Sequence, residues 1–180
     1  ATARSLTFNG ACEAGTNTGS NIVGDGVASE PTCWNGGATD WNESVWYSVT
    51  LPAGETEFVA SVLEGTLSSG NTAMQIYSGT CGSLTELDCV LGGASVSATG
   101  LTPGDTYYIM LDGKGGNDGD FCISVSELPA NDNICDAISI STGDGCTTGT
   151  NSGSTAEAGD ADPSCVNGPA NTLNTVWYSF

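Results

Sequence analysis

The sequence contains no histidine and only two basic residues, Arg4 and Lys114, against 21 acidic ones. Without histidine, an ordinary Ser–His or Cys–His catalytic group cannot be built. The formal net charge of −19 at pH 7 repels phosphates and anionic lipid headgroups, so nucleic acid and membrane insertion are not expected. Cations are the natural counterpart of such a surface, although the acidity can equally serve solubility in a salty medium.

The sequence also lacks any apolar run of about 18 residues, which excludes a membrane-spanning helix. It opens on Ala1-Thr2-Ala3 with no basic and apolar leader, so a signal peptide is either already removed or not part of this chain. The 26 glycines, with many Thr, Ser and Asn, leave little material for long amphipathic helices. We therefore expect an all-β protein.

Eight cysteines are present, without a Cys-x-x-Cys motif. An even number of cysteines in a chain without histidine favours disulfides over a zinc site. Disulfides persist in oxidising compartments, so we expect an extracellular or cell-surface protein.

An internal repeat is the most informative pattern in the chain. Three segments of the first half return in the same order near the C-terminus, with residue numbers 131 to 134 higher. The matching pairs are Gly15–Ser20 with Gly149–Ser154, Glu30–Cys33 with Asp162–Cys165, and Ser44–Val49 with Thr175–Phe180. Small changes in offset are expected where surface loops differ in length.

The repeat predicts two domains, joined through Leu128-Pro129-Ala130. Residues 1–128 form a first β-sandwich repeat that lacks its opening segment, because Asn131–Ala137 has only Ala1–Arg4 as its counterpart. Residues 131–180 form the N-terminal portion of a second repeat, too short to bury its apolar face alone. Either the chain belongs to a longer tandem array, which we favour, or this portion pairs with a neighbouring copy in a fibre.

Strands alternate with Gly, Pro and Asn clusters every ten to fifteen residues, as is typical of an antiparallel β-sandwich. The segment 57–63 is expected to pair with 45–51 as a hairpin across the turn at Pro52–Gly54. The strands are expected at 45–51, 57–63, 72–77, 95–98, 106–111 and 121–125.

The cysteines suggest three disulfides. Cys81 and Cys89 flank a loop short enough to close on itself, and the repeat suggests Cys12 with Cys33 and Cys146 with Cys165. Cys122 and Cys135 then remain, and they either bond to each other or reach outside the chain.

Four segments in order resemble the bacterial pre-peptidase C-terminal domain family, and Asn131–Cys135 with the paired cysteines is similar to repeated modules of large exported proteins of Bacteroidota-type bacteria. The resemblance implies a jelly-roll-like sandwich, often calcium-binding, that serves as a non-catalytic accessory or adhesive module. The chain departs from the family pattern at Asn71–Ala73. The four segments are Val45–Gly54, Met74–Leu84, Leu101–Ile109 and Gly119–Val125.

Acidic loops are the candidate calcium sites, because Ca²⁺ takes six to eight oxygen ligands from carboxylates and carbonyls. The alternative is an ordinary solvated loop surface. The candidates are Asp25, Glu30, Asp40 and Glu43 in the first repeat, Glu157, Asp160 and Asp162 in the second, and Asp112, Asp118 and Asp120 near Lys114.

Trp34 and Trp41 could form an aromatic platform for glycans, whereas the repeat places Trp46 and Trp177 at equivalent core positions. We interpret the chain as a non-catalytic structural or adhesive repeat of an extracellular fibre or bacterial surface protein, stabilised by disulfides and Ca²⁺. Its expected partners are copies of itself or adjacent repeats, with surface glycans as a further candidate. The alternative interpretation is a carbohydrate-binding accessory module of a secreted hydrolase.

Overall fold

The computed structural model describes residues 2–21, 31–33, 43–67, 70–143, 145–151, 153–155 and 175–180. The chain divides into two compact units, Ala1–Glu127 and Leu128–Phe180. None of the helices in the described ranges has the length and apolar character needed to cross a membrane.

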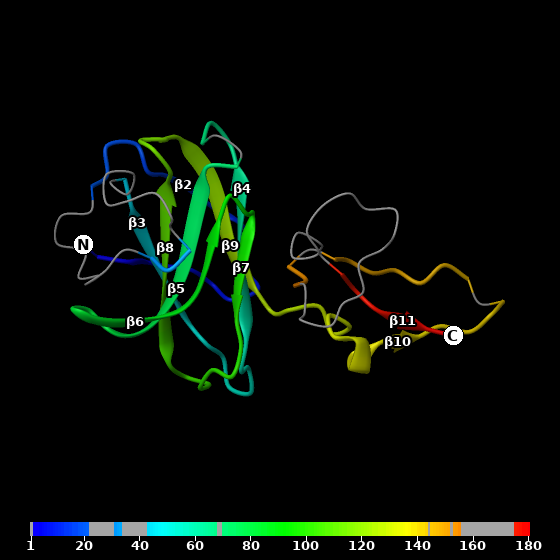
Figure 1. The fold of residues 1–180 in the computed structure, drawn as a ribbon. Coiled ribbons are helices and arrows are strands. Elements are labelled where there is room, and N and C mark those ends of the chain that lie inside the picture. The colour runs from blue at the N-terminus through cyan, green and yellow to red at the C-terminus, as the bar shows by residue number, and fades with distance from the viewer. Residues whose placement is uncertain are drawn as a thin grey trace. The chain divides into compact units, whose positions relative to one another are not determined.

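The first unit is an antiparallel β-sandwich, which confirms the all-β prediction. One sheet has the strand order β1-β3-β8-β5-β6 and the other β2-β9-β4-β7. Without β1, the orders 3-8-5-6 and 2-9-4-7 are those of a jelly roll (Figure 1). The strands are β1 Arg4–Ser5, β2 Glu13–Thr16, β3 Val45–Thr50, β4 Phe58–Glu64, β5 Thr72–Thr80, β6 Ser83–Leu91, β7 Ser95–Ala98, β8 Thr106–Gly113 and β9 Asp120–Ser126.

The core lies between the two sheets and follows from the alternation of side chains along each strand. On β9, Phe121, Ile123 and Val125 are buried, while the residues between them are half-buried. Phe58 and Ile109 contribute from facing sheets and are fully buried. Burial of each such side chain contributes about 1.5–3 kcal/mol to the stability of the folded state. The space between the sheets is therefore the hydrophobic core of this unit.

The five-stranded sheet is also buried on its outer face, which explains the long apolar stretch of β5. Trp46, Tyr77 and Met110 form a second apolar cluster there with Ala73. The rings of Trp46 and Tyr77 lie 5.5 Å apart at their centroids. Strands buried on both faces lose the simple alternation of apolar and polar residues.

Two predictions about strand pairing were wrong. β4 does not pair with β3; it pairs with β7 and β9 in the other sheet, because the 52–57 connection crosses between sheets instead of closing a hairpin. The segment between Cys81 and Cys89 does not form the predicted disulfide-closed loop. It is β6, which pairs with β5 from Thr80 opposite Ser83 onward, with a bulge that leaves Leu87 without an opposite residue.

The disulfide pairing also differs from the prediction. Cys12 bonds to Cys122, because β2 pairs with β9 with Ala14 opposite Cys122. Cys33 bonds to Cys89. An extended strand rises about 3.3 Å per residue, so β6 carries Cys89 far beyond the Cα separation of about 4.4–6.8 Å that a bond with Cys81 would need.

Three cysteines carry free thiols, which contradicts the predicted Cys81–Cys89 and Cys146–Cys165 bonds and, of the two alternatives for Cys135, the bond to Cys122. Cys81, Cys135 and Cys146 are exposed and free. Cys81 lies in the turn between β5 and β6, which holds it away from Cys89. Cys165, the predicted partner of Cys146, lies outside the described residues.

The second unit contains short elements only. Its described residues include a 3-10 helix, η1 (Ile134–Asp136), and two strands, β10 (Ile138–Ser139) and β11 (Tyr178–Ser179), that pair in parallel. Asn131 and Asp132 at its start are buried, at 4% and 3% exposure. Polar groups so thoroughly buried need hydrogen-bond partners: the Asp132 carboxylate accepts from the Thr155 N–H at 2.8 Å, and the Asn131 amide donates to the Trp177 carbonyl at 2.9 Å.

Candidate functional site

An open groove of about 890 Å³ lies at the N-terminal edge of the first unit. We call it the N-terminal groove and define it by Arg4, Gly15, Asn21, Ser44 and Trp46, which are among its lining residues. These residues come from β1, β2, β3, the residue before β3 and the segment after β2. The groove is therefore assembled by several segments, and Gly15, Ser44 and Trp46 among them belong to the repeated motifs.

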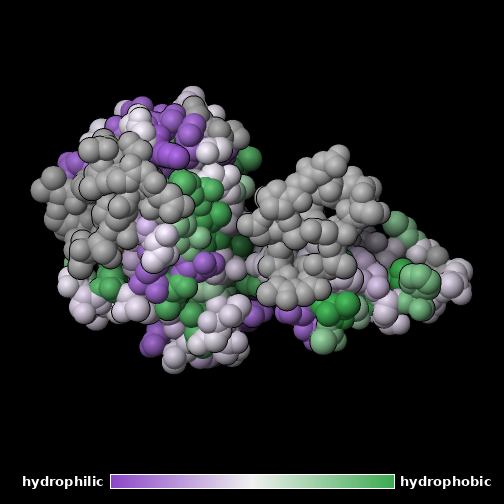
Figure 2. Space-filling view, in the orientation of Figure 1, coloured by the Kyte–Doolittle hydropathy of each residue, from purple (hydrophilic) through white to green (hydrophobic). Residues whose placement is uncertain are grey.

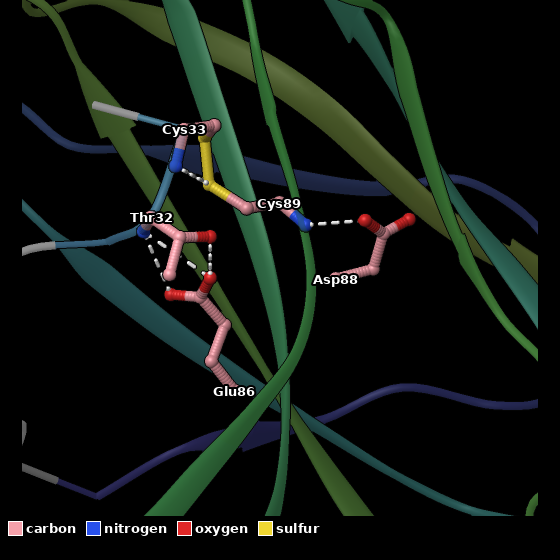
Figure 3. Close-up of a disulfide and its surroundings, with 5 residues drawn as sticks. All are labelled: Thr32, Cys33, Glu86, Asp88 and Cys89. Atoms are coloured by element: carbon pink, nitrogen blue, oxygen red, sulfur yellow. Dashed lines mark hydrogen bonds between the residues drawn. A yellow bond between two sulfur atoms is a disulfide. The ribbon is translucent and has the colours of Figure 1, made fainter. Parts of the chain in front are cut away.

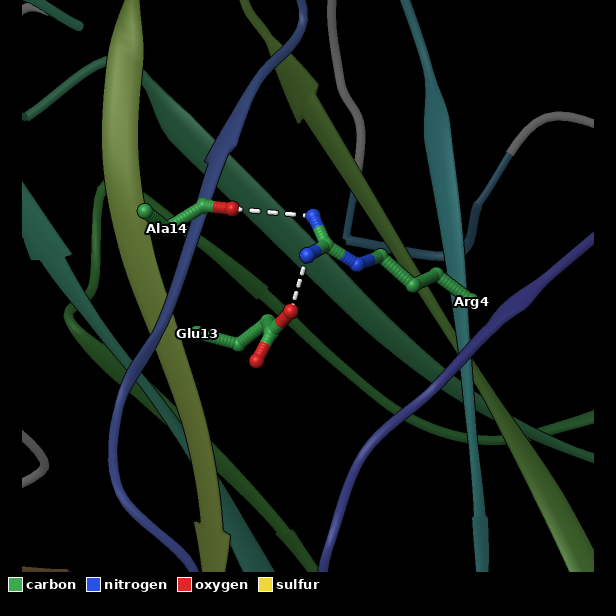
Figure 4. A network of polar contacts seen from close by, with 3 residues as sticks. All are labelled: Arg4, Glu13 and Ala14. Carbon is green, nitrogen blue, oxygen red and sulfur yellow. Dashed lines mark hydrogen bonds and ion pairs between the residues drawn. The ribbon is translucent and has the colours of Figure 1, made fainter.

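Arg4 joins the two sheets at this groove. Its guanidinium donates to the backbone carbonyl of Ala14 at 3.0 Å and forms an ion pair with Glu13 (Figure 4). Arg4 belongs to the five-stranded sheet, whereas Glu13 and Ala14 belong to β2 of the other sheet. Both charged side chains are partly exposed, so the contact mainly sets the position of β1 and contributes little free energy.

Gly15 is required by the close approach of two aromatic rings. A Cβ at this position would overlap the hydroxyl of Tyr47 and the ring of Phe121. Tyr47 is buried at 3% exposure. Burial raises the pKa of Tyr47; the positive charge of Arg4 lowers it, and the negative charge of Glu13 raises it. The hydroxyl thus stays protonated at neutral pH and packs against the bare backbone of Gly15.

Asn17 ties the turn after β2 to the loop before β9. Its side-chain oxygen accepts a hydrogen bond from the Gly119 N–H at 2.9 Å, and its amide nitrogen donates to the Asn117 carbonyl at 3.1 Å. Asn17 is fully buried. The sequence marked Asn17 only as part of the repeated Gly-Thr-Asn motif, and this structural role was not predicted.

A second candidate is the polar part of the buried outer face of the five-stranded sheet. Gln75 is fully buried, and neither atom of its amide group has a hydrogen-bond partner among the described residues. The same holds for the Tyr77 hydroxyl, the Trp46 indole nitrogen and one carboxylate oxygen of Glu43. Buried polar atoms without partners cost free energy, so this face combines apolar packing with unsatisfied polar groups.

Asp112 and Glu43 meet at the edge of this face. Asp112 is fully buried on β8, and its carboxylate accepts a hydrogen bond from the Glu43 N–H at 3.2 Å. Both residues were predicted metal ligands, assigned to separate clusters by sequence. The structure brings these two together.

The Cys33–Cys89 disulfide fastens residues 31–33 to β6. The Thr32 N–H donates to both carboxylate oxygens of Glu86 at 3.2 Å, and the Thr32 hydroxyl also donates to Glu86 (Figure 3). The Asp88 carboxylate accepts from the Cys89 N–H at 2.8 Å. The acidic side chains of β6 thus serve local hydrogen bonds.

The other predicted acidic ligands do not gather. Asp118 and Asp120 are exposed at the end of the first unit where the β8–β9 turn lies and where hydrophilic residues collect (Figure 2). In the part of the chain that the structure describes, no three His, Cys, Asp or Glu side chains form a metal-binding group. Outside the described residues lie Asp25, Glu30, Asp40, Glu157, Asp160 and Asp162, as well as Trp34 and Trp41.

The described part of the second unit reproduces contacts of the first. Ser20 donates to the Asn17 carbonyl through its N–H at 3.0 Å and its hydroxyl at 2.6 Å. Ser154 makes the same two bonds to the Asn151 carbonyl, at 3.2 and 2.8 Å. These residue numbers differ by 134 (154 − 20 and 151 − 17).

The strand pairing is reproduced as well. In the first unit β1 and β3 run parallel with Arg4 opposite Tyr47, and in the second β10 and β11 run parallel with Ile138 opposite Tyr178. Gly149 lies under the Tyr178 hydroxyl as Gly15 lies under that of Tyr47. The same short sequence motifs therefore build the same local structure in both units.

Comparisons with known proteins are sparse. No family model and no curated protein matches this chain. Among solved structures, a periplasmic inhibitor of g-type lysozyme from Aeromonas hydrophila, PliG, is similar with a TM-score of 0.37 and 10% sequence identity, over 69% of this chain and 96% of that one. A similarity at this level carries no argument about function.

Proposed function

We propose that this chain is a non-catalytic structural repeat of an extracellular fibre or surface protein, built from successive copies of one disulfide-bonded sandwich similar to the pre-peptidase C-terminal family. The observation that carries the proposal is the reproduction of the Ser20–Asn17 and Gly15–Tyr47 contacts at Ser154–Asn151 and Gly149–Tyr178. Repeat proteins use one structural unit many times, and each unit contacts its neighbours.

Two further features support this function. The disulfides Cys12–Cys122 and Cys33–Cys89 fit an oxidising compartment. The sequence has no histidine to serve as the base of a Ser–His or Cys–His catalytic pair. The proposal therefore assigns the N-terminal groove to recognition instead of chemistry.

Paired glycine substitutions test the repeat. Gly15→Ala is expected to destabilise the first unit, because the new Cβ overlaps Tyr47 and Phe121, and Gly149→Ala is expected to displace Tyr178 in the second. Amide hydrogen exchange followed by mass spectrometry would localise each effect. The repeat is contradicted if Gly149→Ala leaves exchange at residues 149–155 and 175–180 unchanged. Gly145→Ala, at an exposed position where no atom lies near the added Cβ and the backbone has no positive φ, serves as a control for general effects of the substitution.

The fibre and the carbohydrate-binding alternative give different results with the intact chain. We expect negative-stain images and sedimentation of the purified protein to show periodic assemblies and a glycan array to show no specific binding. A monodisperse protein that binds a glycan, and loses this binding in Trp34→Ala or Trp41→Ala, would contradict the structural assignment.

Calcium stabilisation remains part of the proposal. Asp112 is fully buried and accepts a hydrogen bond from the Glu43 N–H, and one carboxylate oxygen of the half-buried Glu43 is buried as well. Hard oxygen ligands of this kind suit Ca²⁺. We expect CaCl₂ to raise the melting temperature more than NaCl of equal ionic strength, and Asp112→Asn to remove this difference. Asp105→Asn, at an exposed position that is not among the candidate ligands, is the matched control. Equal effects of the two salts on the unsubstituted chain would refute the calcium proposal.

A further inference from the structure

Gln75 is a buried polar residue in the middle of an apolar surface. It lies on β5, which runs between β8 and β6 in the five-stranded sheet. Its side chain is fully buried, and neither its amide oxygen nor its amide nitrogen has a hydrogen-bond partner among the described residues. Burial without a partner costs the free energy of removing the amide from water, so a ligand that contacts this group would explain its presence.

The strand register places Gln75 next to Asp112. Asp112 on β8 lies opposite Ala73 on β5, and Gln75 lies opposite Met110, so the two polar residues are diagonal neighbours on the same face of the sheet. Diagonal neighbours in a sheet lie about 7–8 Å apart, which long side chains can span. With Ca–O distances of about 2.3–2.6 Å, a single ion between the two side chains can contact both.

Two carboxylates bring negative charge to this part of the sheet. Asp112 is fully buried and accepts a hydrogen bond from the Glu43 N–H at 3.2 Å, and one carboxylate oxygen of Glu43 is buried without a hydrogen-bond partner among the described residues. Burial of carboxylates is costly unless an opposite charge compensates it. The chain has only two basic residues against 21 acidic ones, and Arg4 is already paired with Glu13. A bound cation is therefore the natural source of compensating charge.

The oxygen atoms available here suit Ca²⁺. A carboxylate has two oxygens with about four lone-pair sites, so the hydrogen bonds that Asp112 accepts do not prevent it from contacting a cation as well. The two carboxylates and the Gln75 amide together offer about three to five ligands, depending on whether each carboxylate binds through one oxygen or two. Ca²⁺ takes six to eight oxygens and combines carboxylates with amide carbonyls and water.

We propose that Gln75 is a ligand of a calcium site, in which its amide oxygen contacts the ion together with the carboxylates of Asp112 and Glu43. This inference rests on the calcium stabilisation proposed above and adds a neutral ligand from β5 to the two acidic ones. The ion joins β5, β8 and the segment before β3. A ligand that binds only the folded state stabilises it, so the site would hold these three segments of the sheet together.

Two substitutions of Gln75 in the intact chain test the proposal. Gln75→Met keeps a side chain of similar size without the amide oxygen, and Gln75→Glu replaces the amide with a charged carboxylate. Isothermal titration calorimetry with CaCl₂ measures the affinity. We expect Gln75→Met to weaken calcium binding about tenfold and Gln75→Glu to strengthen it about tenfold, because the number and charge of the ligands set the affinity of such sites.

The melting temperatures provide an independent measurement. In EDTA, Gln75→Met should melt higher than the unsubstituted chain, because it removes a buried unsatisfied amide, and Gln75→Glu should melt lower, because it adds a third carboxylate to this part of the sheet. Addition of CaCl₂ should raise the melting temperature of Gln75→Glu the most and that of Gln75→Met the least. If Gln75→Met binds calcium as tightly as the unsubstituted chain, Gln75 is no ligand and the inference is wrong, whatever the behaviour of Gln75→Glu.

Tyr77→Phe is the matched control. It removes another buried hydrogen-bonding group from the same face of β5, two residues farther from Asp112 than Gln75 is, and it should leave the calcium affinity unchanged. An equal loss of affinity in Tyr77→Phe and Gln75→Met would also overturn the assignment.

Failure of this inference can be told apart from failure of the calcium proposal. Calcium binding that Asp112→Asn abolishes and Gln75→Met leaves unchanged removes only the role of Gln75. An unsubstituted chain that binds no calcium refutes both proposals. The structural repeat is independent of either result, because the glycine substitutions test it separately.

Discussion

At the scale of single residues, the buried tyrosines differ in whether their hydroxyl groups are satisfied. The Tyr107 hydroxyl accepts a hydrogen bond from the Thr102 N–H at 2.8 Å. The Tyr77 hydroxyl is buried without a partner among the described residues, and burial raises the pKa of Tyr77 well above its usual value, with a further increase from the charge of Glu86. The two side chains therefore bury similar rings, but burial of the hydroxyl group costs more free energy at Tyr77 than at Tyr107.

This difference predicts opposite effects of removing each hydroxyl. Tyr77→Phe is expected to leave the free energy of unfolding unchanged or to raise it, because an unsatisfied buried group is removed. Tyr107→Phe is expected to lower it by about 0.5–1.5 kcal/mol, the typical net value of a hydrogen bond. Urea denaturation measures both. A loss for Tyr77→Phe as large as that for Tyr107→Phe would show that the Tyr77 hydroxyl has a partner.

Asp88 provides a prediction about pH. Burial raises its pKa above the ordinary 3.8; the hydrogen bond from the Cys89 N–H lowers it, and the nearby charge of Glu86 raises it. Because the folded-state pKa is the higher one, the contribution of Asp88 to stability is fully present below about pH 3.8 and is lost as the pH rises through the folded-state pKa. Because Asp88 lies at an exposed position on β6, solvent screens its charge and the loss of stability on its ionisation is expected to be small.

Asp88→Asn keeps an acceptor for the Cys89 N–H and removes the charge. We expect it to raise the melting temperature at pH 7 and to have no effect at pH 3, as measured by circular dichroism. Asp118→Asn, at an exposed position, controls for the general benefit of removing one negative charge. An equal gain in both variants at pH 7 would contradict a specific role for the environment of Asp88.

At the scale of elements, the two disulfides constrain different parts of the sandwich. Cys12–Cys122 lies where β2 joins β9 and has a sequence separation of 110, whereas Cys33–Cys89 fastens residues 31–33 to β6 and has a separation of 56. In the chain-entropy account, closing loops of these lengths stabilises the folded state by about 4–5 kcal/mol in each case.

Removing each bond with paired Cys→Ser substitutions is expected to lower the melting temperature in both variants. The local effects should differ. Loss of Cys33–Cys89 should speed amide exchange in β6, and loss of Cys12–Cys122 should speed it in β2 without affecting β6. Uniform acceleration throughout the first unit in both variants would show instead that the disulfides act only through global stability.

The sequence predicted six of the nine strands of the first unit, because β3, β4, β5, β7, β8 and β9 carry dense apolar or β-branched residues between turn signals. It missed β1 and β2, which are only two and four residues long. It also missed β6, since Leu84-Thr-Glu-Leu-Asp88 lies on an edge and its charged residues resemble those of a loop. The disulfides were mispaired because pairing depends on which strands become neighbours. That order is set by packing between sheets, which short-range spacing does not encode.

Part of the candidate site could also be predicted. The repeat pointed to Gly15–Ser20 and Ser44–Val49, which supply Gly15, Asn17, Ser44 and Trp46 to the groove and its surroundings. The groove itself could not be predicted, because its shape depends on the approach of β1, β2 and β3 in three dimensions. The pairing of Glu43 with Asp112 was hidden for the same reason, since the two lie 69 residues apart in the chain.

At the scale of the whole molecule, the net charge of −19 dominates. Like charges repel one another more in the compact state than in the unfolded chain. The Debye length falls from about 30 Å at 0.01 M salt to about 8 Å at 0.15 M, so added salt should screen this repulsion.

We therefore expect the melting temperature to rise between 0.01 M and 0.15 M NaCl. Tetramethylammonium chloride is the control, because its large cation screens charge but is a poor ligand for carboxylates. An equal rise in both salts indicates screening. A melting temperature independent of both salts would contradict a destabilising role for the net charge.

The bulge at Leu87 affects how copies of this protein can associate. β6 is the outer strand of the five-stranded sheet, and outer strands with free backbone groups invite pairing with other chains. Around the bulge, β6 carries Glu86 and Asp88, and the outer strand of the opposite sheet, β7, is only four residues long. A kinked, acidic edge and a short one both resist indiscriminate sheet growth. The first unit can thereby keep its sheet edges in contact with solvent without amyloid-like aggregation.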